Sequence, residues 1–159
     1  MQSNRLGRDL AILFSVVLLL YLAAFQGVEH LRARKGPWRV TFERDPQGVP
    51  AIVIAQARLG VSRFHIRFPE ESATTTNLPA VLAFDTPRQP PFDAPFGRVI
   101  YEDLTFLPGA VTFDLFGHEI ELLPRALLVN RHEHPWQAEG ALTLWRTNKV
   151  PSIRVPGAK

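Results

Sequence analysis

One uninterrupted apolar stretch constrains this chain more than any other feature. Between Leu10 and Phe25 the sequence holds no charge, proline or glycine, and Ser15 is the only conventional polar side chain. Continued through Val28 as a helix, the stretch is about 28 Å long, close to the ~30 Å hydrocarbon core of a bilayer. It therefore predicts a transmembrane helix over residues 10–28, preceded by a polar tail over residues 1–9.

The same stretch could instead open a cleavable signal peptide, because two arginines precede it. The best small-residue cleavage site ends at Ala24 with Leu22 two positions earlier, and the apolar run is longer than a usual signal core. We therefore expect a retained signal anchor. Within it, Ala23 and Gly27 are small residues four apart, a spacing that lets a second membrane helix approach closely.

The positive charge of the chain is concentrated near this span. The formal net charge is +3, yet the thirteen basic side chains after residue 35 are balanced by thirteen acidic ones. A neutral domain lacks the excess of cations that nucleic-acid binding requires. We expect Arg32, Arg34 and Lys35, in a linker over residues 29–37, to contact anionic lipid headgroups.

Two arguments about sidedness oppose each other. More Lys and Arg follow the span than precede it, which by the positive-inside rule places the domain in the cytoplasm. A short basic tail before an apolar run is instead typical of an exported domain, and the absence of cysteine suits an oxidising compartment. The balance favours an extracytoplasmic (periplasmic) domain on a single-pass membrane protein.

Beyond the span, the sequence predicts an all-β domain over residues 38–146. All 14 prolines lie from Pro37 onward, which excludes long helices, and apolar and polar residues alternate between them. The predicted strands cover residues 38–43, 51–57, 62–68, 80–84, 98–107, 110–115, 119–123, 125–130 and 141–146. This spacing is typical of an antiparallel β-sandwich of immunoglobulin-like architecture, with a jelly roll or small β-barrel as the alternative and an extended tail over residues 147–159.

Two segments of the domain are candidate partner contacts. The proline-rich connection over residues 86–97 carries Phe92 and Phe96, and long loops without regular structure tend to be functional. The alternative is that both rings pack against their own domain. On the strand over residues 62–68, Arg63 and Arg67 lie on the polar face, where they could pair with acidic groups of a neighbour.

A histidine-rich segment is the candidate metal site. His132 and His134 point the same way on an extended strand, and a third histidine, His118, precedes them. The His-x-His spacing followed by Glu139 resembles the first metal motif of cupins, which implies a metal-dependent enzyme. We favour the alternative, a solvated polar loop, because Pro135 interrupts the strand and no second metal motif follows.

No other catalytic signature is present in the sequence. It has no G-x-S-x-G elbow, no P-loop and no dinucleotide fingerprint. We therefore expect a non-enzymatic protein without cofactor, acting as an accessory or assembly subunit of a larger complex with other integral membrane proteins. The alternative function is a membrane-anchored ligand-binding module or cupin-like enzyme that uses the segment around His132 and His134.

Overall fold

The computed structural model describes the backbone of residues 3–148, and the side chains of residues 7–27 and 36–147. The chain divides into two compact units, one ending at Lys35 and the other beginning at Gly36. Each unit is described by itself. The side chains of Arg32, Arg34 and Lys35 and most of the predicted tail over residues 147–159 lie outside the described part.

The first unit is the single helix α1 (Ser3–Lys35), which contains a segment, Gly7–Gly27, long and apolar enough to cross a membrane. Its large apolar side chains are exposed, by as much as 69% at Phe14. The Ser15 hydroxyl donates to the carbonyl of Ala11 at 2.8 Å, so this polar group is satisfied within the helix, as hydrocarbon surroundings require. The helix continues to Lys35, through most of the predicted linker.

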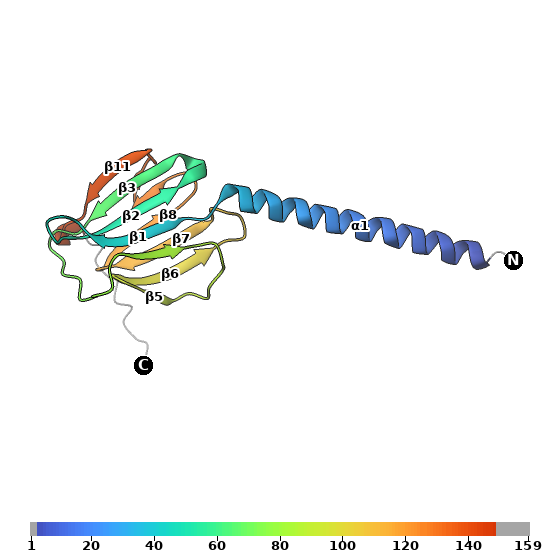
Figure 1. The fold of residues 1–159 in the computed structure, drawn as a ribbon, viewed down its shortest axis with the longest axis horizontal. Helices are drawn as coiled ribbons and strands as arrows, with labels where there is room; N and C mark the ends of the chain where they lie inside the picture. Colours follow the sequence, from blue (N-terminus) through green and yellow to red (C-terminus); the bar gives the residue numbers. More distant parts are fainter. Residues whose placement is uncertain (1–2, 149–159) are drawn as a thin grey trace. The chain divides into compact units, whose positions relative to one another are not determined.

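The second unit consists of two sheets, confirming the predicted β-sandwich (Figure 1). Sheet A has the order β11-β3-β2-β1-β4 and sheet B the order β10-β9-β8-β7-β6-β5. The strands are β1 (Arg39–Arg44), β2 (Pro50–Gln56), β3 (Val61–Arg67), β4 (Ala80–Ala83), β5 (Phe92–Ala94), β6 (Gly97–Asp103), β7 (Ala110–Leu115), β8 (His118–Leu122), β9 (Leu127–Val129), β10 (His132–His134) and β11 (Glu139–Thr143). Two short 3-10 helices are η1 (Ala57–Leu59) and η2 (Arg146–Asn148).

Neighbouring strands are antiparallel with one exception. Sheet B follows the chain as a meander from β5 to β10, and in sheet A the strands β3, β2, β1 and β4 are antiparallel as well. Strand β11 runs parallel to β3, with Glu139 beside Arg63 and Thr143 beside Arg67. The predicted antiparallel sandwich therefore carries one parallel edge.

The core is an aromatic cluster that joins the two sheets. Phe42 of β1 and Phe113 of β7 are both fully buried, and their rings meet edge-on with centroids 6.3 Å apart. Phe84 packs edge-on against the same Phe113 ring at 5.6 Å. Such edge-to-face geometry is favoured by the quadrupole of the rings, so the cluster fixes the sheets beyond simple apolar burial.

Two strands lie where the sequence indicated loops. Strand β5 forms within the proline-rich connection and pairs with β6, and β10 pairs with β9. The β9–β10 turn is made by Asn130 and Arg131, with φ of 50° and 68°, as in a type I′ hairpin turn. Three-residue strands are too short for a periodic signal, and His132–His134 contains no apolar residue to reveal one.

The loop after β6 is firmly anchored. The predicted strand over residues 98–107 ends at Asp103, and Leu104 and Leu107 are buried beyond it. Trp38 Nε1 donates to the carbonyl of Gly109 at 3.0 Å. Gly109 has φ of +76°, and a Cβ there would lie 2.4 Å from the Asp103 carbonyl oxygen, so the turn requires glycine.

Candidate functional site

His118 belongs to the core of the domain. Asn130 Oδ1 accepts from the backbone N–H of Glu119 at 3.0 Å, which turns Asn130 Nδ2 toward His118 Nδ1, also at 3.0 Å. The amide nitrogen can only donate, so Nδ1 accepts and the imidazole is neutral. The ring is fully buried against Phe68, with centroids 5.9 Å apart. His118 therefore secures the β8–β9 pair from inside.

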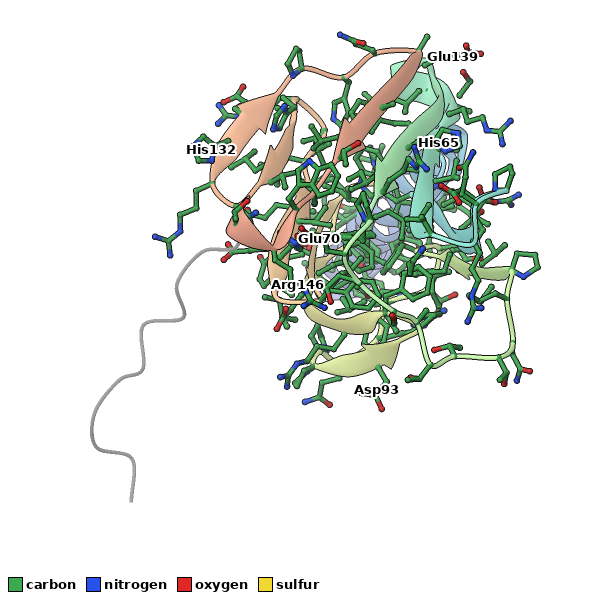
Figure 2. The ribbon with its side chains drawn as sticks, turned by 90° about the vertical axis from the view of Figure 1, so that its left-hand side faces the viewer. His65, Glu70, Asp93, His132, Glu139 and Arg146 are labelled. Carbon is green, nitrogen blue, oxygen red and sulfur yellow. The ribbon has the colours of Figure 1, made fainter. Side chains whose placement is uncertain are left out.

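The other members of the predicted metal set are dispersed. His132 Nδ1 lies 3.0 Å from the Asn130 carbonyl oxygen and donates to it. His132 and His134 lie on edge strand β10 of sheet B, whereas Glu139 begins β11 of sheet A, well separated from His132 in Figure 2. In the described part of the chain, no three His, Cys, Asp or Glu side chains are grouped so as to hold a metal ion.

A cavity of about 430 Å³ lies between the edge strands β10 and β11. It is lined by Val129, Asn130, His132, His134, Leu142, Thr143, Leu144 and Thr147. Its volume falls within the range of small-molecule sites, roughly 300–1,000 Å³. The lining combines apolar walls with two imidazoles and contains no carboxylate, which suits a small, partly apolar ligand better than a cation.

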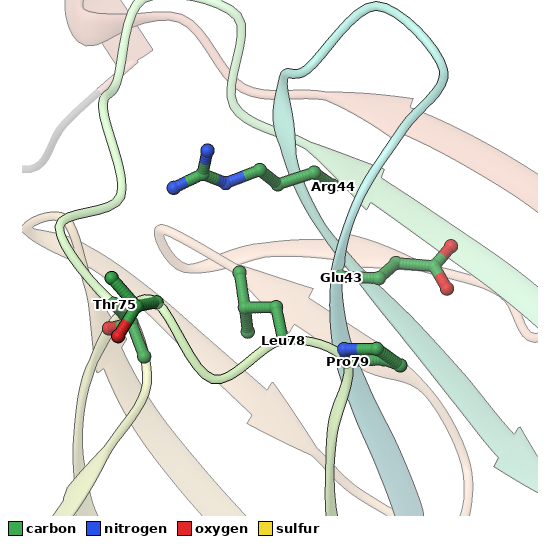
Figure 3. Close-up of a pocket in the computed structure, with 6 residues that line it drawn as sticks. Glu43, Arg44, Thr75, Leu78 and Pro79 are labelled. Atoms are coloured by element: carbon green, nitrogen blue, oxygen red, sulfur yellow. The ribbon is translucent and has the colours of Figure 1, made fainter.

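A second cavity, of about 460 Å³, lies beside edge strand β4 (Figure 3). It is lined by Glu43, Arg44, Thr75, Thr76, Leu78 and Pro79. The Arg44 guanidinium donates to the Ala73 carbonyl at 2.9 Å, and the Thr75 hydroxyl donates to the Pro95 carbonyl at 2.7 Å. These bonds tie down a loop that the sequence marked only as polar, so no sequence signal indicated this cavity.

The two phenylalanines of the proline-rich connection pack against their own domain. Phe96 is only 5% exposed, and its ring lies 5.3 Å from Phe42 and 5.3 Å from Phe116. Phe92 is half-buried against the core, and the Arg88 guanidinium lies 5.3 Å from its ring centroid. This is the alternative given above for these rings, and it leaves Phe96 no free ring face for a partner.

The two arginines of β3 have different surroundings. The Arg67 guanidinium pairs with the Asp45 carboxylate and donates to Gln47 Oε1 at 3.0 Å, bracing the β1–β2 turn. Desolvation alone would raise the pKa of Asp45, but hydrogen bonds from the Val49 N–H and from Arg67 hold that pKa below its usual value. Arg63 is exposed and remains available as a surface contact.

The outer face of sheet B is acidic. Glu119 and Glu121 lie on the same side of β8, and Asp114 is the β7 partner of Glu119. Desolvation raises the pKa of Glu121, a hydrogen bond and the charge of Glu119 raise it further, and Arg131 opposes the shift. This face is a charged surface rather than a metal-binding cluster.

The remaining candidates, Ala23 and Gly27, lie on α1. A Cβ added at Gly27 would meet no other described atom within 4 Å.

The chain matches no protein-family model, no curated protein and no solved structure. Its function is therefore inferred from its own surfaces, namely the exposed helix, the edge strands and the two cavities.

Proposed function

We propose that this protein is a single-pass membrane protein whose β-sandwich acts, without catalysis, as an accessory or assembly subunit of a larger membrane protein complex. One observation carries the proposal. Within the Gly7–Gly27 segment no residue of the membrane-length window is buried, whereas the sandwich encloses its own apolar core. The domain covers its own apolar core, whereas the described part of the helix is apolar and unburied and so needs apolar surroundings.

Membrane integration is tested by extraction. Washing membranes with sodium carbonate or concentrated salt should leave the protein in the pellet, because an apolar span is insensitive to ionic strength whereas attachment through Arg32, Arg34 and Lys35 alone is not. Recovery of the intact protein in the soluble fraction would refute the proposal at its first step.

The subunit role is tested by co-purification in mild detergent. We expect Ala23→Leu with Gly27→Leu to weaken recovery of integral membrane partners about tenfold, or ~1.4 kcal/mol, because bulk blocks close helix approach. A Cβ at position 27 would meet no described atom within 4 Å. Ala24→Leu, compared with Ala23→Leu alone, is the matched control, since it adds the same bulk on another side of the helix.

Further contacts in this proposal come from the domain. Arg63 offers a cation on sheet A, and the short edge strand β4 offers unpaired backbone next to Val81, which is 55% exposed. An extended segment of a partner could pair with this edge. A single detergent-solubilised monomer, with no neighbour crosslinked in native membranes, would count decisively against the subunit role.

Two finer features belong to the same proposal. We propose that the domain resembles immunoglobulin domains only in having two packed sheets, because its sheet B is a continuous meander rather than a Greek key. We also propose that the domain lies on the extracytoplasmic side. A reporter fused after Lys159 that is active only in the cytoplasm would reverse that assignment.

Ligand binding is the second candidate, favoured by the cavity between β10 and β11. If that cavity is a ligand site, Leu142→Trp should fill it and abolish binding of small apolar probes, while the second cavity keeps its shape.

We expect no metal to bind at His132 and His134. Elemental analysis should give substoichiometric transition metal, and His132→Ala with His134→Ala should leave the melting temperature unchanged; a full equivalent of metal lost in that double variant would favour the enzyme instead.

A further inference from the structure

The chain enters the β-sandwich at Gly36, and the end of the domain at which this residue lies is called the Gly36 end. Gln56 Nε2 donates to the Gly36 carbonyl at 2.9 Å, and Trp38 Nε1 donates to the Gly109 carbonyl at 3.0 Å. The Trp38 ring also packs 5.1 Å from the ring of Trp136, whose Nε1 donates to the Leu123 carbonyl at 2.8 Å. The segments gathered at this Gly36 end are therefore the turns 57–60 and 123–126 and the loop 104–109.

The loop 104–109 presents Phe106 to solvent at the Gly36 end. Phe106 is 73% exposed, more than any large apolar side chain that the structure describes on α1. The loop is held from both sides, because its leucines are buried and the Asp103 carboxylate accepts from the Thr105 N–H at 3.0 Å. No charged residue occurs between Leu104 and Phe113. An aromatic ring is thus fixed outward on an uncharged tip, although nothing in the domain requires its exposure.

Chain length limits how far this end can lie from the membrane. Only residues 28–35 separate the end of the apolar segment at Gly27 from Gly36, and as helix they span about 12 Å. The headgroup layer is itself roughly 5–8 Å thick on each side of a bilayer. Gly36 itself therefore stays within roughly 16 Å of the bilayer's hydrocarbon core, since one Cα–Cα step of about 3.8 Å follows the helix.

Charges of both signs lie at this end, because the exposed Asp103 directly precedes the loop 104–109. Arg58 and Arg125 are exposed on the turns 57–60 and 123–126. In the sequence, Arg32, Arg34 and Lys35 add three cations immediately before Gly36. Cations attract anionic headgroups, and aromatic rings are favoured at the boundary between headgroups and hydrocarbon.

We infer that the Gly36 end of the sandwich rests on the headgroup layer of the membrane that α1 crosses, with Phe106 inserted and Arg58 and Arg125 beside it. This inference rests on the proposed membrane anchoring. It adds a second, peripheral attachment of the domain to the membrane.

The test uses the absence of cysteine, which makes any introduced thiol unique. Phe106→Cys, Trp145→Cys and Leu18→Cys are each labelled with an environment-sensitive fluorophore in the full chain. The proteins are reconstituted into vesicles of phosphatidylcholine mixed with phosphatidylglycerol. Trp145 is the matched control, an exposed aromatic side chain beyond β11 at the opposite end of the domain.

We expect the label at position 106 to be quenched by spin-labelled lipid, and its quenching by aqueous iodide to be about tenfold weaker than at position 145. The melting temperature of Phe106→Cys should match wild type, because the ring makes no core contact. Removing phosphatidylglycerol should weaken the lipid quenching at position 106, since the flanking arginines lose their counter-charge.

The three labelled positions distinguish lipid contact at Phe106 from membrane anchoring through α1. Equal iodide quenching at positions 106 and 145, with position 18 shielded, overturns the inference and leaves the membrane anchor intact. Iodide access at position 18 refutes the anchor itself. If position 106 is shielded in native membranes but not in lipid vesicles that contain only this protein, another protein covers Phe106. That result also overturns the assignment of Phe106 to the lipid.

Discussion

The apolar segment of α1 and the core of the sandwich contain the same kinds of side chain in opposite surroundings. Leucine, valine and phenylalanine are about half exposed along Gly7–Gly27, whereas those between the two sheets are almost completely buried. Burial of apolar surface contributes about 25 cal/mol per Å², so the sandwich derives its stability from its own chain. The helix derives its stability from whatever surrounds it. Substitutions in the two regions should therefore affect different measurements.

The largest contrast is expected from truncating one phenylalanine in each region. Phe113→Ala removes the ring at the centre of the aromatic cluster and should lower the free energy of unfolding of the domain by about 3–5 kcal/mol. Phe14→Ala, in α1, should leave the melting temperature of the domain unchanged. Near-UV circular dichroism of the detergent-solubilised protein during heating measures both. Similar losses in the two variants would mean that helix and domain unfold together.

A smaller effect should come from the buried hydrogen bond of Trp38. Trp38→Phe keeps the aromatic packing but leaves the Gly109 carbonyl without its indole donor, which should cost about 1–3 kcal/mol in urea denaturation. The control is Trp145→Phe, where the side chain is 46% exposed and the loss should stay within ~0.5 kcal/mol. If Trp38→Phe were neutral, the loop 104–109 would be held by its leucines alone.

The smallest effect concerns Asp45 at the domain surface. Its pKa is lowered in the folded state, so its contribution to stability is fully present above the unfolded pKa of about 3.9 and is lost as pH falls through the folded value. The difference in melting temperature between wild type and Asp45→Asn should therefore shrink on acidification below about pH 4. The exposed Asp93→Asn serves as the control. A difference that grew toward acid pH would contradict the Arg67–Asp45 pairing.

The overall architecture was predictable because its signals are local. An uncharged apolar run of membrane length and strands of alternating polarity each occupy consecutive residues, so the long apolar helix and the sandwich followed from the sequence. The parallel pairing of β11 with β3 did not, because it joins segments far apart in the chain and leaves no periodic trace. Strand β10 was missed for a different reason, since its pairing depends on a turn with two residues at positive φ.

The candidate site was less predictable because it depends on which face a side chain occupies. Two phenylalanines in one proline-rich connection appear equivalent in sequence, yet β5 pairing places Phe96 in the core and Phe92 at its margin. The histidines likewise separate, because His118 occupies an inward-facing position of β8 whereas His132 lies on an edge strand. Single-residue outcomes of this kind require the register of strand pairs, which composition does not encode.

The parallel edge of sheet A also sets an order of events during synthesis. All of sheet B and four strands of sheet A leave the ribosome before Glu139–Thr143, so the free edge of β3 waits unpaired while the rest of the domain is already available to fold. Until β11 is synthesised, the Phe64 ring is not covered by Gly140. Glycine is required at position 140, because a Cβ there would lie 2.5 Å from the Phe64 ring. A nascent domain would thus spend this interval with one unpaired strand edge exposed. During that time a chaperone or a neighbouring chain has access to the edge.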